Sequence, residues 1–272
     1  MRVVKLRIAW IVALLAGLMP QVASADTGFL DRSLTLKGKS YAYQVYVPQG
    51  YTSEKKWPII VYLHGNEHQG TDGMRQTNAP MAMAIREHRD WFPAIVVFPQ
   101  AQPDTRWSDS EMQDLVLAEL DQTISDFHGD ERRLYLTGFS MGGSGTYRIT
   151  FHHPDRFAAV LVVAGRVQPG PRYTPQEAQT DRQANAFVAE PDPFAALAPV
   201  IKGVPIWIFQ GDADQAVDVE QSRRMVAALK KQGAEVKYFE YPGVDHVNAA
   251  VRAYFTPAVY EWLLQQQLKH AP

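Results

Sequence analysis

A short stretch near the middle of the chain, Tyr135-Leu-Thr-Gly-Phe-Ser-Met-Gly-Gly-Ser-Gly145, constrains the fold more than any other. It contains the pattern G-x-S-x-G at Gly138, Ser140 and Gly142, between an apolar, β-prone segment and a sequence typical of a helix. A sharp turn from strand to helix needs small residues two places either side of the serine, because larger side chains would clash. Such a turn lifts the serine hydroxyl above the sheet at a helix N-terminus, where negative charge is favoured. The context therefore predicts a nucleophilic serine rather than an incidental glycine-rich turn.

The first 25 residues read as a signal peptide rather than as part of the fold. Arg2, Lys5 and Arg7 are followed by the apolar run Ile8–Met19, and Ala23-Ser-Ala25 forms an A-x-A cleavage site. Twelve apolar residues are fewer than the roughly 20 that span a bilayer. We expect cleavage after Ala25, export to the periplasm or the extracellular space, and no membrane span in the mature chain. A short N-terminal anchor helix is the alternative.

The composition of the remaining chain excludes several classes of function. Removing residues 1–25 leaves 272 − 25 = 247 residues with 27 − 3 = 24 Lys and Arg against 29 Asp and Glu, a net charge of −5. This balance argues against nucleic acid as a partner. The absence of cysteine excludes disulfides, thiolate metal sites and a cysteine nucleophile. No phosphate loop, dinucleotide fingerprint or metal motif is present, so we expect neither a cofactor nor a metal.

Residues 26–272 show the alternation of strands and helices that one α/β domain requires. A hairpin is predicted over residues 33–47, and near-continuous apolar runs, typical of strands covered on both faces, follow it. These runs are Pro58–Leu63, Ala94–Phe98, Leu134–Leu136, Ala158–Val163, Pro205–Phe209 and Val236–Phe239. Helical sequences between them predict a mostly parallel sheet with helices on both faces. In such sheets the functional site lies at the carboxyl ends of the strands.

The segment 166–200 interrupts this alternation. It contains six prolines and no strand, and Thr174-Pro-Gln-Glu177 is typical of a helix start. It follows a predicted strand, so it lies above the expected site. Long connections in compact domains are usually functional, which favours a short cap that shapes the substrate pocket over a plain surface excursion.

A serine hydroxyl needs a base to take its proton and a third group to hold that base. His246 is the predicted base, because it follows the strand Val236–Phe239 in a loop at the carboxyl edge of the sheet. The chain order of serine, acid and histidine is that of α/β-hydrolases. His64, at the end of an earlier strand, is expected to shape its turn rather than to act as base.

The acid is expected in the loop after the strand Pro205–Phe209, which supplies two candidates. Asp212 lies directly against Gly211 and is expected to bond the loop's own amides. Asp214 is further out, where a carboxylate can reach an imidazole, and is preferred. For the oxyanion, one donor is expected to be the backbone N–H of Met141, and the other is placed at Asn66, in the loop after Pro58–Leu63.

Together these motifs resemble the secreted α/β-hydrolases of the carboxylesterase and polyhydroxybutyrate-depolymerase-like group, often labelled predicted peptidases of the prolyl oligopeptidase type. The resemblance covers almost the whole chain after Ala25. It rests on Leu63-His-Gly65, Phe98-Pro-Gln100 with Trp107, Gly138–Gly145, Pro154-Asp-Arg-Phe157, Pro205–Phe209 before Gly211-Asp-Ala-Asp214, and Tyr241-Pro-Gly243 before His246. It implies an α/β-hydrolase fold and supports Asp214 as the acid. The loop that usually reads H-G-x-G-E-x-G here has Glu67 at the second glycine and His68 at the glutamate.

The expected activity is hydrolysis of carboxylic esters, small or polymer-linked, through an acyl-enzyme. A peptidase of the prolyl oligopeptidase type is the first alternative, and a non-catalytic binding protein on the same fold is the second. Oligopeptidases of this fold use a large accessory domain to hold a peptide, whereas here only residues 166–200 remain to build substrate contacts. We expect these residues to form an acyl or alcohol pocket, with Trp107 as an aromatic wall. The sequence predicts no oligomeric state.

Overall fold

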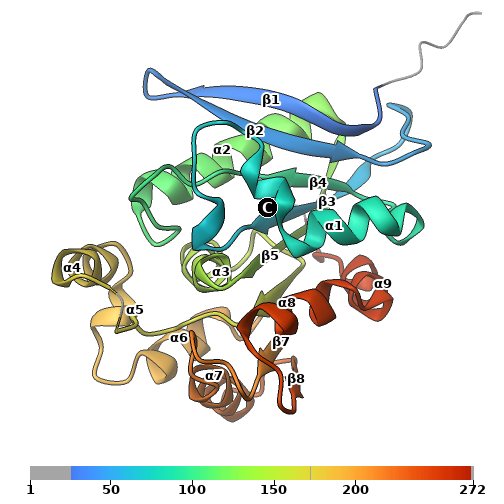
Figure 1. Cartoon of the computed structure of the whole chain (residues 1–272). Coiled ribbons are helices and arrows are strands. Elements are labelled where there is room, and N and C mark those ends of the chain that lie inside the picture. The colour runs from blue at the N-terminus through green and yellow to red at the C-terminus, as the bar shows by residue number, and fades with distance from the viewer. Residues whose placement is uncertain (1–25, 172, 271–272) are drawn as a thin grey trace, which may run out of the picture.

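A computed structural model describes residues 26–171 and 173–270, so the predicted signal peptide lies outside the described residues. Within these ranges the chain forms an eight-stranded sheet in the order β1-β2-β4-β3-β5-β6-β7-β8, which runs from top to bottom in Figure 1. The strands are β1 (Gly28–Leu36), β2 (Lys39–Val47), β3 (Trp57–Leu63), β4 (Ile95–Phe98), β5 (Gly129–Phe139), β6 (Ala159–Val163), β7 (Ile206–Gly211) and β8 (Val236–Tyr241).

The sheet is mixed but mostly parallel. β1 and β2 form the predicted antiparallel hairpin, which joins the sheet antiparallel to β4. All pairs from β4 to β8 are parallel, so the carboxyl ends of these strands share one edge. The predicted α/β-hydrolase fold is confirmed. Two strands begin several residues earlier than predicted: β1 begins at Gly28, where the hairpin was expected from residue 33, and β5 begins at Gly129, whereas the sequence indicated only Leu134–Leu136.

Helices cover both faces of the sheet and bury a hydrophobic cluster on each. α2, α3, α6 and α7 contribute to one cluster, and α1, α8 and α9 to the other. The helices are α1 (Pro80–Glu87), α2 (Ser110–Asp126), α3 (Met141–His152), α4 (Pro175–Ala184), α5 (Ala186–Ala189), α6 (Pro193–Ile201), α7 (Glu220–Lys231), α8 (His246–Tyr254) and α9 (Pro257–Gln265), with short 3-10 turns η1 (Asn66–His68), η2 (Arg75–Asn78) and η3 (Arg89–Trp91). None of the helices in the described ranges is long and apolar enough to cross a membrane.

The segment between β6 and β7 contains α4, α5 and α6, on the left of Figure 1. The predicted helix start is confirmed: the Thr174 hydroxyl accepts from the Glu177 amide, and the Glu177 carboxylate accepts from the Thr174 amide. α6 packs against α7 and α3. This segment is therefore attached to the helix that follows Ser140.

Candidate active site

The turn between β5 and α3 is as tight as the G-x-S-x-G pattern predicts. Ser140 has φ 57° and ψ −113°, a left-handed conformation that few non-glycine residues adopt. A Cβ on Gly138 would stand 2.3 Å from the main chain of Gly142, and a Cβ on Gly142 only 1.9 Å from the carbonyl oxygen of Leu63 in β3. Close approach of two strands and a helix therefore requires both glycines, and it holds Ser140 at the carboxyl edge of the sheet.

Ser140, His246 and Asp214 lie in one chain of hydrogen bonds. The Oγ of Ser140 is 2.7 Å from Nε2 of His246, and Nδ1 of His246 is 2.6 Å from Oδ2 of Asp214. A carboxylate only accepts, so Nδ1 carries the ring proton and Nε2 accepts from the serine hydroxyl. This tautomer has the form in which an imidazole can take the proton of a serine.

The Asp214 side chain is fully buried, and its loop holds it in place. Oδ1 accepts from the amides of Ala216 and Val217, each at 2.8 Å. Oδ2 accepts from Nε2 of Gln210 at 2.8 Å as well as from His246. Four donors thus surround one carboxylate and orient it toward the imidazole.

Asp212 has a different position from Asp214. Its Oδ1 accepts from the amide of Gly243, 2.6 Å away, so it ties its own loop to the loop that precedes His246. We expected it to bond amides of its own loop, and it bonds the neighbouring loop instead. His246 also differs from expectation: it is the first residue of α8, behind the N-cap Asp245, rather than part of an open loop.

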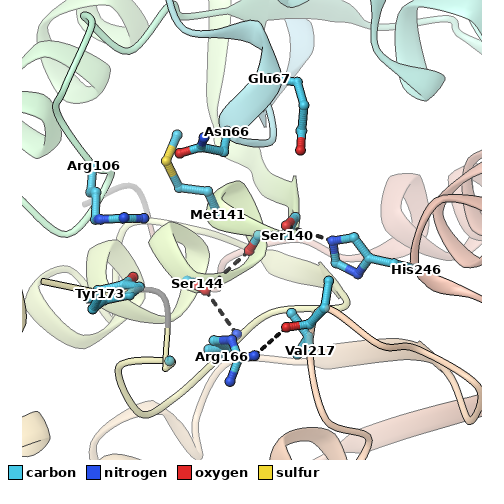
Figure 2. A pocket seen from close by; sticks show the side chains of 12 residues that line it. Asn66, Glu67, Arg106, Ser140, Met141, Ser144, Arg166, Tyr173, Val217 and His246 are labelled. Atoms are coloured by element: carbon cyan, nitrogen blue, oxygen red, sulfur yellow. Dashed lines mark hydrogen bonds between the residues drawn. The ribbon is translucent and has the colours of Figure 1, made fainter.

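A cavity of about 270 Å³ opens over Ser140 (Figure 2). It is lined by Asn66, Glu67, Arg106, Ser140, Met141, Ser144, Arg166, Gly170, Tyr173, Ala216, Val217 and His246. Both predicted oxyanion residues border it. Met141 is the first residue of α3 and Asn66 the first of η1, positions whose amides have no acceptor within their own helix. Among the described residues, no group of three or more His, Asp or Glu side chains is placed to hold a metal ion.

Trp107 does not border the cavity, so its expected place as an aromatic wall is wrong. The side chain is fully buried, and its Nε1 donates to the carbonyl oxygen of His64 at 3.0 Å. A Cβ on Gly145 of α3 would meet Trp107 at 2.3 Å. The indole therefore packs beneath the site, between α3 and the end of β3, and supports it from below.

His64 shapes its turn as expected. Its Nδ1 donates to the carbonyl oxygen of Gly65 at 2.6 Å, and its Nε2 accepts from the amide of Ala101 at 3.0 Å. Burial lowers the pKa of His64 to about 3, which keeps the ring neutral. The ring thus connects the ends of β3 and β4 and is not available as the base of Ser140.

Several cavity residues were not predicted from the sequence. Glu67, Arg106, Arg166 and Tyr173 border the cavity, and Ser144 lies one helical turn beyond Ser140. A signal existed for Arg166, because it follows β6 at the carboxyl edge where the site was expected. Arg106 and Tyr173 lie in long connections, and the pattern of those segments did not indicate which side chains turn inward.

Comparison with known proteins places the chain among hydrolases. Acetylxylan esterase A of Emericella nidulans is 28% identical over 159 residues, which cover 54% of this chain and 49% of that protein. An uncharacterized secreted protein of Arthroderma benhamiae is 26% identical over 204 residues, which cover 70% of this chain and 21% of that protein. The chain thus spans about half the length of the first of these relatives and about a fifth of the length of the second.

The structure is also similar to that of a thermostable esterase, with a TM-score of 0.68 and 26% identity, covering 88% of this chain and 63% of that one. Residues 100–270 match the prolyl oligopeptidase family, and this range includes Ser140, Asp214 and His246. The chain therefore belongs to the prolyl oligopeptidase family of serine hydrolases with the α/β-hydrolase fold.

Proposed function

We propose that this protein hydrolyses carboxylic esters through an acyl-enzyme. The hydrogen-bond chain from Ser140 through His246 to Asp214 is the observation that carries the proposal. In the first step Oγ of Ser140 bonds to the carbonyl carbon while Nε2 of His246 takes the hydroxyl proton. The bond to the leaving alcohol oxygen then breaks, and His246 gives that oxygen the proton. Water repeats the sequence on the acyl-serine, releasing the acid and restoring Ser140.

When Ser140 adds to the ester, negative charge develops on the carbonyl oxygen, and hydrogen-bond donors must stabilise it. We assign the amides of Met141 and Asn66 to this role, since both border the cavity and neither has an acceptor within its own helix. Each donor of this kind lowers the barrier by about 3 kcal/mol. The resulting oxyanion would lie at the start of α3, where the helix dipole favours negative charge.

The size of the cavity favours an ester over a peptide. A volume of about 270 Å³ suits a short acyl or alcohol group. Of the described residues in the 166–200 segment, only Arg166, Gly170 and Tyr173 border it, and a peptide would need contacts on both sides of the scissile bond. The esterase relative and the esterase structure support the same choice. Membership of the prolyl oligopeptidase family keeps a peptidase as the second candidate. The 166–200 segment serves in this proposal as a short cap, and export follows from the predicted signal peptide at residues 1–25.

A fluorophosphonate probe tests the nucleophile directly. We expect the wild-type protein to be labelled and Ser140→Ala not to be, with kcat lower by roughly 10⁶-fold in the variant. Ser144→Ala is the matched control and should still be labelled, because Ser144 borders the same cavity but its hydroxyl bonds main-chain groups of Ser140 and Arg166 rather than a histidine. A folded Ser140→Ala that keeps a tenth of wild-type turnover would exclude Ser140. Efficient cleavage of a proline-containing peptide, with ordinary alkyl esters inert, would favour the peptidase.

A further inference from the structure

The position of His246 divides the cavity into a leaving-group side and an acyl side. In the proposed mechanism His246 protonates the leaving oxygen, so the alcohol must lie next to its Nε2. The acyl group then extends to the opposite side of Ser140. Figure 2 shows Arg106, Tyr173 and Arg166 on that side, away from His246.

Arg166 is joined to the main chain of the nucleophile through one hydroxyl group. The amide of Arg166 donates to Oγ of Ser144 at 2.9 Å, and that hydroxyl donates to the carbonyl oxygen of Ser140 at 3.1 Å. The Arg166 side chain borders the cavity, and its Nη2 donates to the carbonyl oxygen of Ala216. This bond holds the guanidinium of Arg166 at the wall of the cavity.

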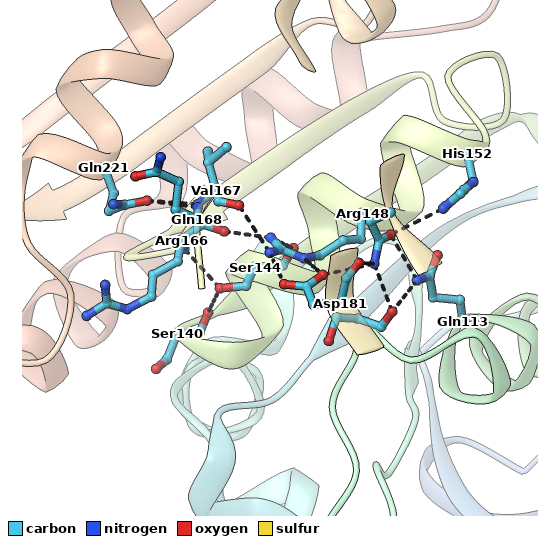
Figure 3. Close-up of polar contacts among 12 residues, drawn as sticks. Gln113, Ser140, Ser144, Arg148, His152, Arg166, Val167, Gln168, Asp181 and Gln221 are labelled. Carbon is cyan, nitrogen blue, oxygen red and sulfur yellow. Dashed lines mark hydrogen bonds and ion pairs between the residues drawn. The ribbon is translucent and has the colours of Figure 1, made fainter. Parts of the chain in front are cut away.

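A buried ion pair fixes the segment that carries Arg166 (Figure 3). The guanidinium of Arg148 in α3 bonds both carboxylate oxygens of Asp181 in α4, at 3.0 and 2.6 Å, and both side chains are fully buried. Arg148 also donates to the carbonyl oxygens of Arg166, at 2.7 Å, and Val167, at 3.1 Å. These bonds attach the main chain of Arg166 to α3 and so hold Arg166 in place before a ligand binds. Less conformational entropy is then lost on binding.

Charges of opposite sign lie on the two sides of the cavity. Arg106 borders the acyl side, and its Cζ lies 4.0 Å from the ring centre of Tyr173. It also forms an ion pair with Glu177, with 2.7 Å between Nη2 and Oε1. Glu67 lies on the other side and points toward Ser140 and His246 in Figure 2. Its Oε2 lies 3.1 Å from where a Cβ on Gly65 would stand. A carboxylate on the acyl part would therefore meet guanidinium groups, whereas a carboxylate on the leaving group would lie beside Glu67, which repels it.

We propose that the preferred substrates are esters whose acyl part ends in a carboxylate, with Arg166 as the residue that binds it. This rests on the proposed ester hydrolysis and specifies its substrate class. A cavity of about 270 Å³ limits the acyl part to a short chain, as in half-esters of short dicarboxylic acids. Arginine suits this role because its planar fork of donors matches a carboxylate.

The test compares methyl butyrate with monomethyl succinate, in which a carboxylate replaces the terminal methyl group at equal chain length. Each kcat/KM is divided by the rate of alkaline hydrolysis of the same ester. A charge-assisted contact predicts that succinate is favoured by about ten- to a hundredfold. Arg166→Met should bring this ratio close to one, and Arg166→Lys should keep part of it. The matched control is Arg182→Met, in the same segment on an exposed face of α4, which should keep the wild-type ratio.

The ratio separates binding from support of the fold. Loss of the bond to Ala216 in Arg166→Met would slow both esters alike, whereas loss of carboxylate binding slows only the succinate ester. A wild-type ratio of one or less overturns the inference, as does an unchanged ratio in Arg166→Met. A third ester, the butyryl ester of glycolate, carries its carboxylate on the alcohol, and a preference for it would also overturn the assignment. If the probe labels Ser140 but both methyl esters are inert, this inference fails alone. If Ser140 is neither labelled nor needed for turnover, the proposed function fails with it.

Discussion

Replacing Asp214 by asparagine should cost about 10⁴-fold in kcat, and the structure shows why. Oδ2 of Asp214 accepts from Nδ1 of His246 and from Nε2 of Gln210. In Asp214→Asn an NH₂ group would face both donors if Oδ1 keeps its bonds to the amides of Ala216 and Val217. His246 would then move its proton to Nε2, and the ring could no longer accept the proton of Ser140. A loss of 10⁴-fold corresponds to about 5.5 kcal/mol of barrier.

Gln210 cannot relieve this conflict by turning its amide. Its Nε2 also donates to the carbonyl oxygen of Val217 at 3.1 Å, and its Oε1 accepts from Oγ of Ser222 at 2.9 Å. Turning the amide would break both bonds. We therefore also expect Asp214→Asn to lose about 1–3 kcal/mol of stability, the usual cost of a buried unsatisfied donor.

Asp212→Asn is the matched control, because an asparagine Oδ1 can still accept from the amide of Gly243. Its kcat should stay within a few-fold of wild type. The assay is kcat on nitrophenyl butyrate, with a thermal melt to establish that each variant is folded. A kcat of Asp214→Asn within tenfold of wild type would refute the reasoning. If instead Asp212→Asn loses kcat by this amount and Asp214→Asn does not, the roles of the two carboxylates must be exchanged.

Two further predictions concern buried carboxyl groups. Glu119 in α2 is fully buried, with no partner for either oxygen among the described residues, and burial raises its pKa well above the usual range. The unfolded chain loses this proton first, so the group lowers stability as pH rises above about 4.3. Glu119→Gln should therefore raise the unfolding midpoint at pH 7 and lose this advantage below pH 4; an equal gain at both values would contradict the argument. Asp181→Ala leaves the charge of Arg148 buried without its partner, and should cost about 3–5 kcal/mol in chemical denaturation. The exposed pair of Lys37 and Asp114 is its control, since Asp114→Ala should cost far less, and equal losses would refute the role of burial.

The sequence predicted the parts of the site whose constraints are local. The turn at Ser140 is an example, because the clash that excludes a side chain at Gly142 involves a neighbouring strand that any such turn must approach. The strands and their parallel order followed from apolar runs and connection lengths. Asp214 and His246 could be nominated because each follows a strand at the carboxyl edge.

Features set by distant contacts could not be read in this way. Trp107 was misplaced because one aromatic residue in a loop carries no sign of whether it faces a cavity or the interior. Its position depends on Gly145, where the missing side chain leaves room for the indole. Glu67 was noticed as a departure from a family pattern, but its direction toward the cavity depends on the turn η1.

A spacing of four residues along α3 connects the local turn at Ser140 with the distant contacts of the 166–200 segment. Ser140, Ser144 and Arg148 are four residues apart, so they follow one another along one face of α3 from its N-terminus. Ser144 donates to the carbonyl oxygen of Ser140, and Arg148 donates to that of Ser144 at 3.2 Å. The same two side chains bind the main chain of Arg166, and Arg148 binds Asp181 of α4. The helix that positions the candidate nucleophile therefore also fixes the start of the 166–200 segment. A displacement of that segment relative to α3 would break the bonds that Ser144 and Arg148 make to the main chain of Arg166, and Ser144 also bonds the main chain of Ser140. The position of the cavity wall is therefore coupled to the position of the serine.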